Sequence, residues 1–140
     1  MKKDFSFGIV PIFFEKEKPH FLLVKHAKGH WSFPKGHKNA NETDKETALR
    51  ELKEEICIES IKLQDTEPII EEYNFVSDGE TIHKQVSYFL GIVHSKTATP
   101  DLKEILEIKW CDFDEALKQM TYESSKRTLY KAKTSIETVN

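Results

Sequence analysis

Three glutamates are spaced so that one face of a helix would gather their carboxylates. Glu51, Glu54 and Glu55 lie three and four positions apart, and side chains at these separations are neighbours on an α-helix. Like charges placed in this way destabilise a helix by about 0.2–0.5 kcal/mol per pair, and a hard divalent cation would relieve their repulsion. Oxygen ligands in this arrangement suit Mg²⁺, so the spacing predicts a metal site.

Arg50 directly precedes this acidic group and is placed to hold one of its members in position. It lies four positions after Glu46 and four before Glu54, so its guanidinium can reach either carboxylate along a helix. The alternative interpretation is a solvated helix of ion pairs, which needs no metal. The wider pattern favours the metal site, because a loop glycine, a further glutamate and the apolar positions fall in register with it.

The acidic helix is part of a pattern that spans residues 36–58. The loop glycine, Gly36, is followed after five residues by Glu42, and seven more residues lead to Arg50. The stretch resembles the Nudix box, written Gly-x5-Glu-x7-Arg-Glu-apolar-x-Glu-Glu-x-Gly-apolar. It matches at every fixed position except Cys57, where the family has glycine.

Cys57 changes the expected end of the helix rather than its chemistry. The family's glycine would end the helix in a left-handed conformation, and a residue with a Cβ costs on the order of 1 kcal/mol there. Nothing nearby in the sequence would activate the thiol, so we do not interpret Cys57 as a nucleophile.

The resemblance implies a fold and a set of roles. Nudix proteins are α/β/α sandwiches with a central mixed sheet, so it implies the α/β class and one Nudix hydrolase domain over residues 1–140. It implies a Mg²⁺ ion, or Mn²⁺ in its place, bound by carboxylate and backbone oxygens of Glu51, Glu55, Glu54 and Gly36. It assigns catalytic or supporting roles to Glu104, Glu54, Arg50 and Glu42. The metal would neutralise phosphate charge and make the attacking water more acidic.

The residues that lead into the box are more selective. The run from His30 to His37 reads His-Trp-Ser-Phe-Pro-Lys-Gly-His and resembles the branch that hydrolyses diadenosine tetraphosphate (Ap4A), whereas the wider family more often has Pro-Gly-Gly. The resemblance implies that His30, Lys35 and His37 contact substrate, Lys35 as a point charge and His37 as a hydrogen-bond donor. The alternative for His37 is a loop histidine without a role.

Later segments match this branch less closely. Lys84 precedes Tyr88 in a strand where the branch has a basic residue that meets the phosphates, and we expect both to contact substrate. Phe75 and Tyr122 fall near positions where the branch stacks rings on adenine, and core packing is the alternative for both. His26 stands where a basic, phosphate-facing residue would be expected.

The implied reaction is asymmetric hydrolysis of Ap4A to ATP and AMP. Glu104 lies six residues before Trp110, where the branch has a glutamate that serves as metal ligand or general base, and Glu107 competes for that role. We prefer Glu104 as the base that activates water.

Two other classes of function remain open. A different Nudix enzyme would act on another nucleoside polyphosphate, on 5′-triphosphorylated RNA, on a diphosphoinositol polyphosphate or on an oxidised nucleoside triphosphate. The net charge of −3 makes the RNA and the inositol substrates less favoured, because the chain lacks the surplus of basic residues that would indicate a nucleic-acid surface. A binding module with the same fold would be expected to lack some box carboxylates, and all are present.

Other elements must position these groups. Thr43, with Glu46 three residues on, predicts a capping box at the start of the acidic helix, and its buried stripe would be Ala48, Leu49, Leu52 and Ile56. Apolar runs predict strands at 7–14, 20–26, 61–63, 69–76, 85–93 and 105–113, and a short extended piece at 31–33. Pro11 would mark a bulge or an edge. Asp114 would cap a helix at 115–120, and a final helix would span 124–137.

The composition is that of one domain in a reducing compartment. The chain has 140 residues, of which 38% are hydrophobic, enough for one core. Its two cysteines, Cys57 and Cys111, are interpreted as reduced thiols. No signal-peptide pattern and no apolar run of about 20 residues is present. We therefore expect a cytoplasmic monomer that acts on a small dinucleoside polyphosphate, without nucleic acid or membrane.

Overall fold

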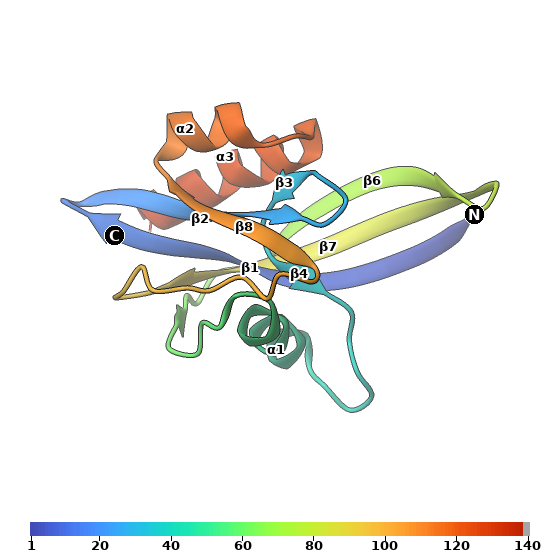
Figure 1. The fold of residues 1–140 in the computed structure, drawn as a ribbon, viewed down its shortest axis with the longest axis horizontal. Coiled ribbons are helices and arrows are strands. Elements are labelled where there is room, and N and C mark those ends of the chain that lie inside the picture. The colour runs from blue at the N-terminus through green and yellow to red at the C-terminus, as the bar shows by residue number, and fades with distance from the viewer. Residues whose placement is uncertain (139–140) are drawn as a thin grey trace.

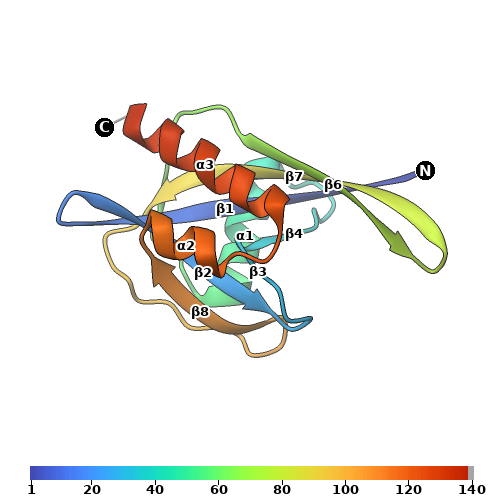
Figure 2. The same cartoon turned by 90° about the horizontal axis from the view of Figure 1, so that it is seen from above.

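A mixed sheet of eight strands runs through the middle of the protein in the computed structural model, which describes residues 1–138 (Figure 1). The strands are β1 Lys2–Glu15, β2 Lys18–His26, β3 Trp31–Ser32, β4 Lys35–Gly36, β5 Lys62–Leu63, β6 Ile69–Ser77, β7 Glu80–Ile92 and β8 Ile105–Cys111. The helices are α1 Asp44–Ile56, α2 Phe113–Gln119 and α3 Glu123–Thr138. Helix α1 covers one face, and α2 and α3 lie together on the other (Figures 1 and 2). The expected α/β/α sandwich is confirmed.

Strand β1 organises the sheet. It runs parallel to β7 from Lys2 to Ile12, and on its other side it pairs antiparallel first with β4 and then with β2. Strands β5 and β6 pair with β7, and β8 pairs with β2. The switch of partner on one side of β1 brings β4, with the start of the acidic motif, onto the centre of the sheet.

The prediction that Pro11 marks a bulge or an edge is wrong. Pro11 lies within β1, opposite Gly91 of β7, so it belongs to an interior strand. On the other side it falls between the residues of β1 that pair with β4 and those that pair with β2. A residue without an N–H group is tolerated at that gap in the ladder.

Both faces of the central strands are buried. Neighbouring residues of a strand point to opposite faces, and Ile9 and Val10 are each 0% exposed. Ile9 packs in the cluster that contains Leu52 and Ile56 of α1, and Val10 packs in the cluster that contains Leu129 of α3. The continuous apolar run of β1 is therefore explained by helices on both sides.

Helix α1 begins and ends as the sequence predicts. Thr43 Oγ1 accepts a hydrogen bond from the Glu46 amide at 3.2 Å, and Glu46 Oε1 accepts one from the Thr43 amide at 2.8 Å. At the other end Cys57 adopts φ 60° and ψ 29°, the left-handed conformation that the family reserves for glycine. Its N–H donates to the Lys53 carbonyl at 3.0 Å, so the helix closes normally despite the Cβ.

Other boundaries differ from the predicted ones. Strands β1 and β7 extend beyond the predicted apolar runs because their first residues, most of them polar, pair with each other. Helix α2 is capped by Asp112, whose carboxylate accepts from the Glu115 amide at 2.8 Å, so the assignment of Asp114 as the cap is wrong. Cys57 and Cys111 are both free thiols. No helix among residues 1–138 is long and apolar enough to cross a membrane.

Candidate active site

Arg50 is the centre of an ion-pair network on α1. Its Nε and Nη2 donate to the two oxygens of Glu42 at 2.6 and 3.1 Å. Its Nη1 donates to Glu51 Oε1 at 3.0 Å and to Glu54 Oε2 at 3.1 Å. Nη2 also donates to the carbonyl of His37 at 2.8 Å. One guanidinium therefore joins the loop before the helix to two of the box carboxylates.

Glu42 ties the polar loop to the helix. Besides the bonds from Arg50, it accepts hydrogen bonds from the Asn39 amide at 2.8 Å and from Thr47 Oγ1 at 3.1 Å. These donors, Arg50 first among them, lower the pKa of Glu42 to about 2. Of the two partners left open for Arg50, the structure shows Glu54, whereas Glu46 caps the helix.

Glu55 is a buried carboxylate without enough partners. It is 2% exposed, and its Oε2 has no hydrogen-bond partner among the described residues. Burial, reinforced by the charges of Glu51 and Glu104, raises the pKa of Glu55 to about 9. Burial also raises the pKa of Glu51. A solvated helix of ion pairs does not account for a buried carboxylate of this kind, so the burial of Glu55 favours the metal site.

Gly36 lies directly against Glu51. A Cβ at this position would overlap the carboxyl group of Glu51, so only glycine lets β4 approach the helix so closely. The approach places the backbone of Gly36 beside the acidic face of α1, as the expected role of its carbonyl requires.

These features fit a divalent cation. Glu55 has an unpartnered oxygen, and the backbone of Gly36 lies beside Glu51, so both offer oxygen donors to a hard ion. The ion would also relieve the repulsion among Glu51, Glu55 and Glu104. Within residues 1–138 no three His, Cys, Asp or Glu side chains are gathered closely enough to enclose a metal by themselves. Mg²⁺ usually keeps several waters and shares itself with substrate phosphates, so a partial set of protein ligands suits it.

Lys84 is held by a cluster that the sequence did not reveal. Its Nζ donates to Asp4 Oδ2 at 2.7 Å and to Ser6 Oγ at 2.6 Å, and it lies 3.4 Å from His37 Nε2. His37 Nε2 is in turn 2.9 Å from Asp4 Oδ1. Asp4 therefore joins two of the predicted phosphate-binding residues. Burial raises the pKa of Asp4, but the hydrogen bonds and charges of Lys84 and His37 outweigh this effect and lower the pKa overall.

Lys35 makes no ion pair with any residue between 1 and 138 and lines two adjoining cavities. Burial and then the charge of Lys84 lower its pKa, while Glu71 and Glu55 oppose that shift. A lysine in this position is available to an anionic ligand.

His26 does not supply the positive charge expected of it. Its Nε2 is 2.8 Å from Ser32 Oγ, and its ring stacks on His30 with 4.3 Å between centroids. Burial, together with the charges of Lys35 and His30, lowers the pKa of His26 to about 3. His26 lines the carboxylate pocket and supports His30 by stacking, and its lowered pKa does not favour the positive charge expected of a phosphate-facing residue.

Two cavities adjoin at these cations. The first, which we call the carboxylate pocket, has a volume of about 370 Å³ and is lined by Gly36, His37, Glu55 and Glu104 among others. The second, the aromatic cleft, has a volume of about 640 Å³ and is lined by residues of β6 and α3. Both cavities share the side chains of Lys28, His30, Lys35 and Lys84. A line of cationic and imidazole groups therefore connects the carboxylates to the aromatic rings.

The aromatic cleft contains the rings that the sequence singled out. Phe75 is 39% exposed and Tyr122 is 54% exposed, and both line the cleft, so the core-packing alternative is wrong for both. Tyr73 also lines it, with its ring centroid 6.2 Å from that of Phe75. Tyr73 was not among the predicted site residues, although its place two residues before Phe75 in a strand puts it on the same face.

Tyr88 lies elsewhere. It is 1% exposed and packs edge-on against Phe33 with 5.8 Å between ring centroids. It lines neither the carboxylate pocket nor the aromatic cleft. Because its ring is enclosed in the core, we no longer propose Tyr88 as a substrate contact.

The structure separates Glu104 from its competitor. Glu104 lines the carboxylate pocket, and its charge acts on Glu51 and Glu55. Its carbonyl accepts from the Ala27 amide at 2.8 Å, which ties the loop before β8 to the end of β2. Glu107 lies in β8, opposite Lys25 of β2, and does not line the carboxylate pocket.

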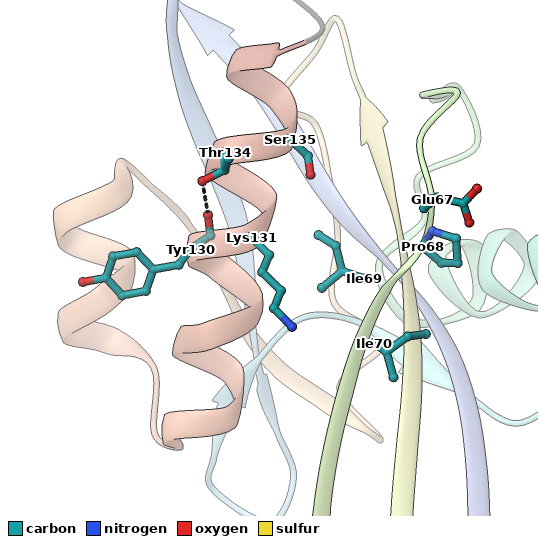
Figure 3. Close-up of a pocket in the computed structure, with 8 residues that line it drawn as sticks. All are labelled: Glu67, Pro68, Ile69, Ile70, Tyr130, Lys131, Thr134 and Ser135. Atoms are coloured by element: carbon teal, nitrogen blue, oxygen red, sulfur yellow. Dashed lines mark hydrogen bonds between the residues drawn. The ribbon is translucent and has the colours of Figure 1, made fainter.

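A third cavity, of about 550 Å³, lies between β6 and α3 (Figure 3). Its lining runs over 67–70 and includes Tyr130, Lys131, Thr134 and Ser135. None of the predicted site residues lines it, so it takes no part in the candidate active site.

A sheet between helical layers, with a carboxylate pocket on a loop–helix–loop, defines a Nudix hydrolase. A family model described as the NUDIX domain matches residues 2–132. The chain belongs to this family.

Its relatives include enzymes of one branch. The chain is 38% identical over 112 residues to the asymmetrical bis(5′-nucleosyl)-tetraphosphatase of Rattus norvegicus, over 78% of this chain and 75% of that one. It is 31% identical over 107 residues to the protein of the same name from Caenorhabditis elegans, over 75% and 76% of the two chains. A solved binary complex of a C. elegans Ap4A hydrolase superposes with a TM-score of 0.82 at 26% identity, covering 96% of this chain and 98% of that one.

Proposed function

We propose that this protein hydrolyses Ap4A asymmetrically, to ATP and AMP, with Mg²⁺ as cofactor. The observation that carries the proposal is the continuity of the two cavities, because Lys28, Lys35 and Lys84 line both of them. A polyphosphate chain on these cations would reach the carboxylate pocket at one end while a nucleoside lies in the aromatic cleft. The names of the rat and C. elegans relatives support the same substrate.

The protein's own groups would divide the work by position. Lys35, Lys84 and His37 bind the phosphates, and Asp4 keeps Lys84 and His37 oriented. Arg50 holds Glu51 and Glu54 in place. A Mg²⁺ ion bound by Glu51, Glu54, Glu55 and the carbonyl of Gly36 would neutralise phosphate charge and acidify water.

Glu104 is the base in this proposal. Its carboxylate lies in the carboxylate pocket and is exposed to solvent there, so it can accept the proton of the attacking water. The phosphate contacts fix the direction of attack, because phosphoryl transfer depends mainly on positioning and charge stabilisation.

The nucleoside would be held by stacking. Tyr73 and Phe75 lie on the β6 side of the cleft and Tyr122 on the α3 side, where His30 is 5.5 Å from it between ring centroids. Bases stack on such rings with little regard to sequence.

The free thiols of Cys57 and Cys111 support a reducing, cytoplasmic location for the reaction.

Turnover of several substrates side by side tests the proposal. The set comprises Ap4A, a 5′-triphosphorylated RNA, an oxidised nucleoside triphosphate and a diphosphoinositol polyphosphate, each with Mg²⁺. We expect kcat/KM for Ap4A to exceed the others by about tenfold or more, a difference of about 1.4 kcal/mol. A higher kcat/KM for the RNA or for a mononucleotide would identify the alternative, a Nudix pyrophosphohydrolase with another substrate.

A further inference from the structure

Glu71 is a buried carboxylate that the proposed reaction does not use. It lies in β6 and is 6% exposed. Its Oε2 accepts a hydrogen bond from Ser124 Oγ at 3.0 Å, and its Oε1 accepts one from Thr128 Oγ1 at 2.9 Å. No lysine, arginine or histidine nitrogen in the described part of the chain lies within ion-pair distance of it. Burial of a carboxylate without a cation is unfavourable, so its place calls for an explanation other than stability.

The two partners of Glu71 belong to one turn of α3. Ser124 and Thr128 are four residues apart in the sequence. Tyr122, just before Ser124, and Arg127, just before Thr128, both line the aromatic cleft. On the strand, Glu71, Tyr73 and Phe75 are every second residue and so point to the same face. Tyr73 and Phe75 line the side of the aromatic cleft opposite α3. The carboxylate therefore joins the strand that carries one wall to the helix that carries the other.

Glu71 also lies between two openings. The aromatic cleft uses the later part of β6 with the start of α3, while the cavity in Figure 3 uses residues 67–70 with the Tyr130–Ser135 part of the helix. Figure 3 shows Ile69 and Ile70 beside that part of α3. Ile69 of β6 packs in the same core cluster as Leu129 and Ala132 of α3. Between the two openings, the hydrogen bonds of Glu71 to Ser124 and Thr128 add a polar link between strand and helix.

The charge of Glu71 has a second consequence inside the cleft. It acts favourably on the positive charge of Lys35, as do Glu55 and Asp4. Of these three carboxylates, Glu71 is the one that lies in β6, the strand that also carries Tyr73 and Phe75 of the aromatic cleft.

We propose that Glu71 is a positioning residue of the aromatic cleft, which ties the first turns of α3 to β6 and so sets the spacing between Tyr122 and the pair Tyr73 and Phe75. The inference rests on the proposed function in one respect, that a nucleoside lies between these rings. Glu71 itself touches no ligand. Its loss would loosen the grip on a base and leave the binding of bare phosphate unchanged.

Calorimetric binding of ATP and of tripolyphosphate, both in EDTA, tests this role. Glu71→Ala removes both hydrogen bonds and should weaken ATP by about tenfold, the scale of one stacked base, and tripolyphosphate by less than about twofold. Glu71→Gln keeps an oxygen acceptor and offers an amide donor to the second hydroxyl, so it should restore most of the affinity for ATP. Glu72→Ala, on the neighbouring exposed residue, is the matched control and should change neither ligand.

Thr128→Val removes one of the two hydrogen bonds at similar volume and keeps the test open if Glu71→Ala does not fold. It should weaken ATP by an intermediate factor and leave tripolyphosphate unchanged. Equal losses for both ligands, full affinity in Glu71→Ala, or a Gln variant as weak as the Ala variant would overturn the role of Glu71. A wild-type protein that bound ATP no better than tripolyphosphate would instead overturn the assignment of the cleft to a nucleoside, and with it the proposed function.

Discussion

Glu55 makes the metal-free protein sensitive to pH. Its pKa is about 9 in the folded protein, whereas an ordinary glutamate has a value near 4.3. The folded state therefore holds this proton more tightly than the unfolded state does. The associated stability is fully present below the ordinary value and is lost as the pH rises through about 9.

Glu55→Gln removes this dependence because a carboxamide stays neutral. In EDTA at about pH 8, the variant should melt higher than the wild type by about 5 °C or more, and the difference should close near pH 4. Calorimetric unfolding over that pH range measures it, with Glu59→Gln on the exposed surface as control. A variant that melts at or below the wild-type temperature at the alkaline end would show that Glu55 is not under strain.

For Glu104 the predicted effect is on the rate of turnover and not on the stability of the fold. Glu104→Gln should lower kcat by about 100-fold or more, the usual contribution of a general base, while circular dichroism and melting temperature stay unchanged. Glu107→Gln, three residues along the same segment and outside the pocket, should keep its activity. Near-normal turnover in the Glu104 variant would remove it from the mechanism.

The residues of the site were predictable to the extent that one stretch of chain encodes them. Lys35, Gly36 and the box glutamates are local in sequence, so their spacing alone brings them together. Asp4 could not be found in this way, because it meets Lys84 only through the parallel pairing of β1 with β7. Tyr88 was misassigned because it lies on the same face of β7 as Lys84 but further along the strand, where the core encloses its ring.

At the scale of elements, the end of α1 departs from the family at one position. Cys57 holds a left-handed conformation with φ 60°, in which the Cβ of an L-residue meets the following carbonyl. The cost falls on the stability of the helix end, since the box carboxylates lie on the preceding turns.

Cys57→Gly should therefore stabilise the protein by about 1 kcal/mol, or about 4 °C in melting temperature. Activity should not change. Cys57→Ala is the matched control, because it removes the thiol but keeps the Cβ and so should gain nothing. Thermal unfolding that placed the Gly variant at or below the Ala variant would contradict the account of the helix end.

Elements with strong local signals were predicted well. The capping box of Thr43 fixed the start of α1. The final helix predicted at 124–137 is present as α3, with Leu129, Ala132 and Ile136 buried. The lengths of β1 and β7 were underestimated, because their outer residues are polar and gain their strand conformation from each other. The cap of α2 was misplaced because Asp112 and Asp114 both stand before the helix, and only the bond to the Glu115 amide distinguishes them.

At the scale of the whole molecule, the site lies where three parts of the chain meet on the sheet. The partner switch of β1 places β4 beside α1, and β7 brings Lys84 alongside Asp4. Helix α3 packs against β6, and residues of both line the aromatic cleft. Figure 2 shows α2 and α3 together over the sheet. The layered class was predictable from the mixture of strands and helices and from the resemblance to the Nudix box. The order of strands was not, because a parallel pairing between distant segments leaves no local mark.

We propose that this arrangement cleaves Ap4A asymmetrically with a bound metal. The most direct measurement is incubation with Ap4A and Mg²⁺ in ¹⁸O-labelled water, followed by mass spectrometry of the products. The account predicts ATP and AMP in equal amounts, with the label in only one of the two, and no turnover once EDTA removes the metal. Formation of ADP alone, or turnover that persists in EDTA, would contradict it.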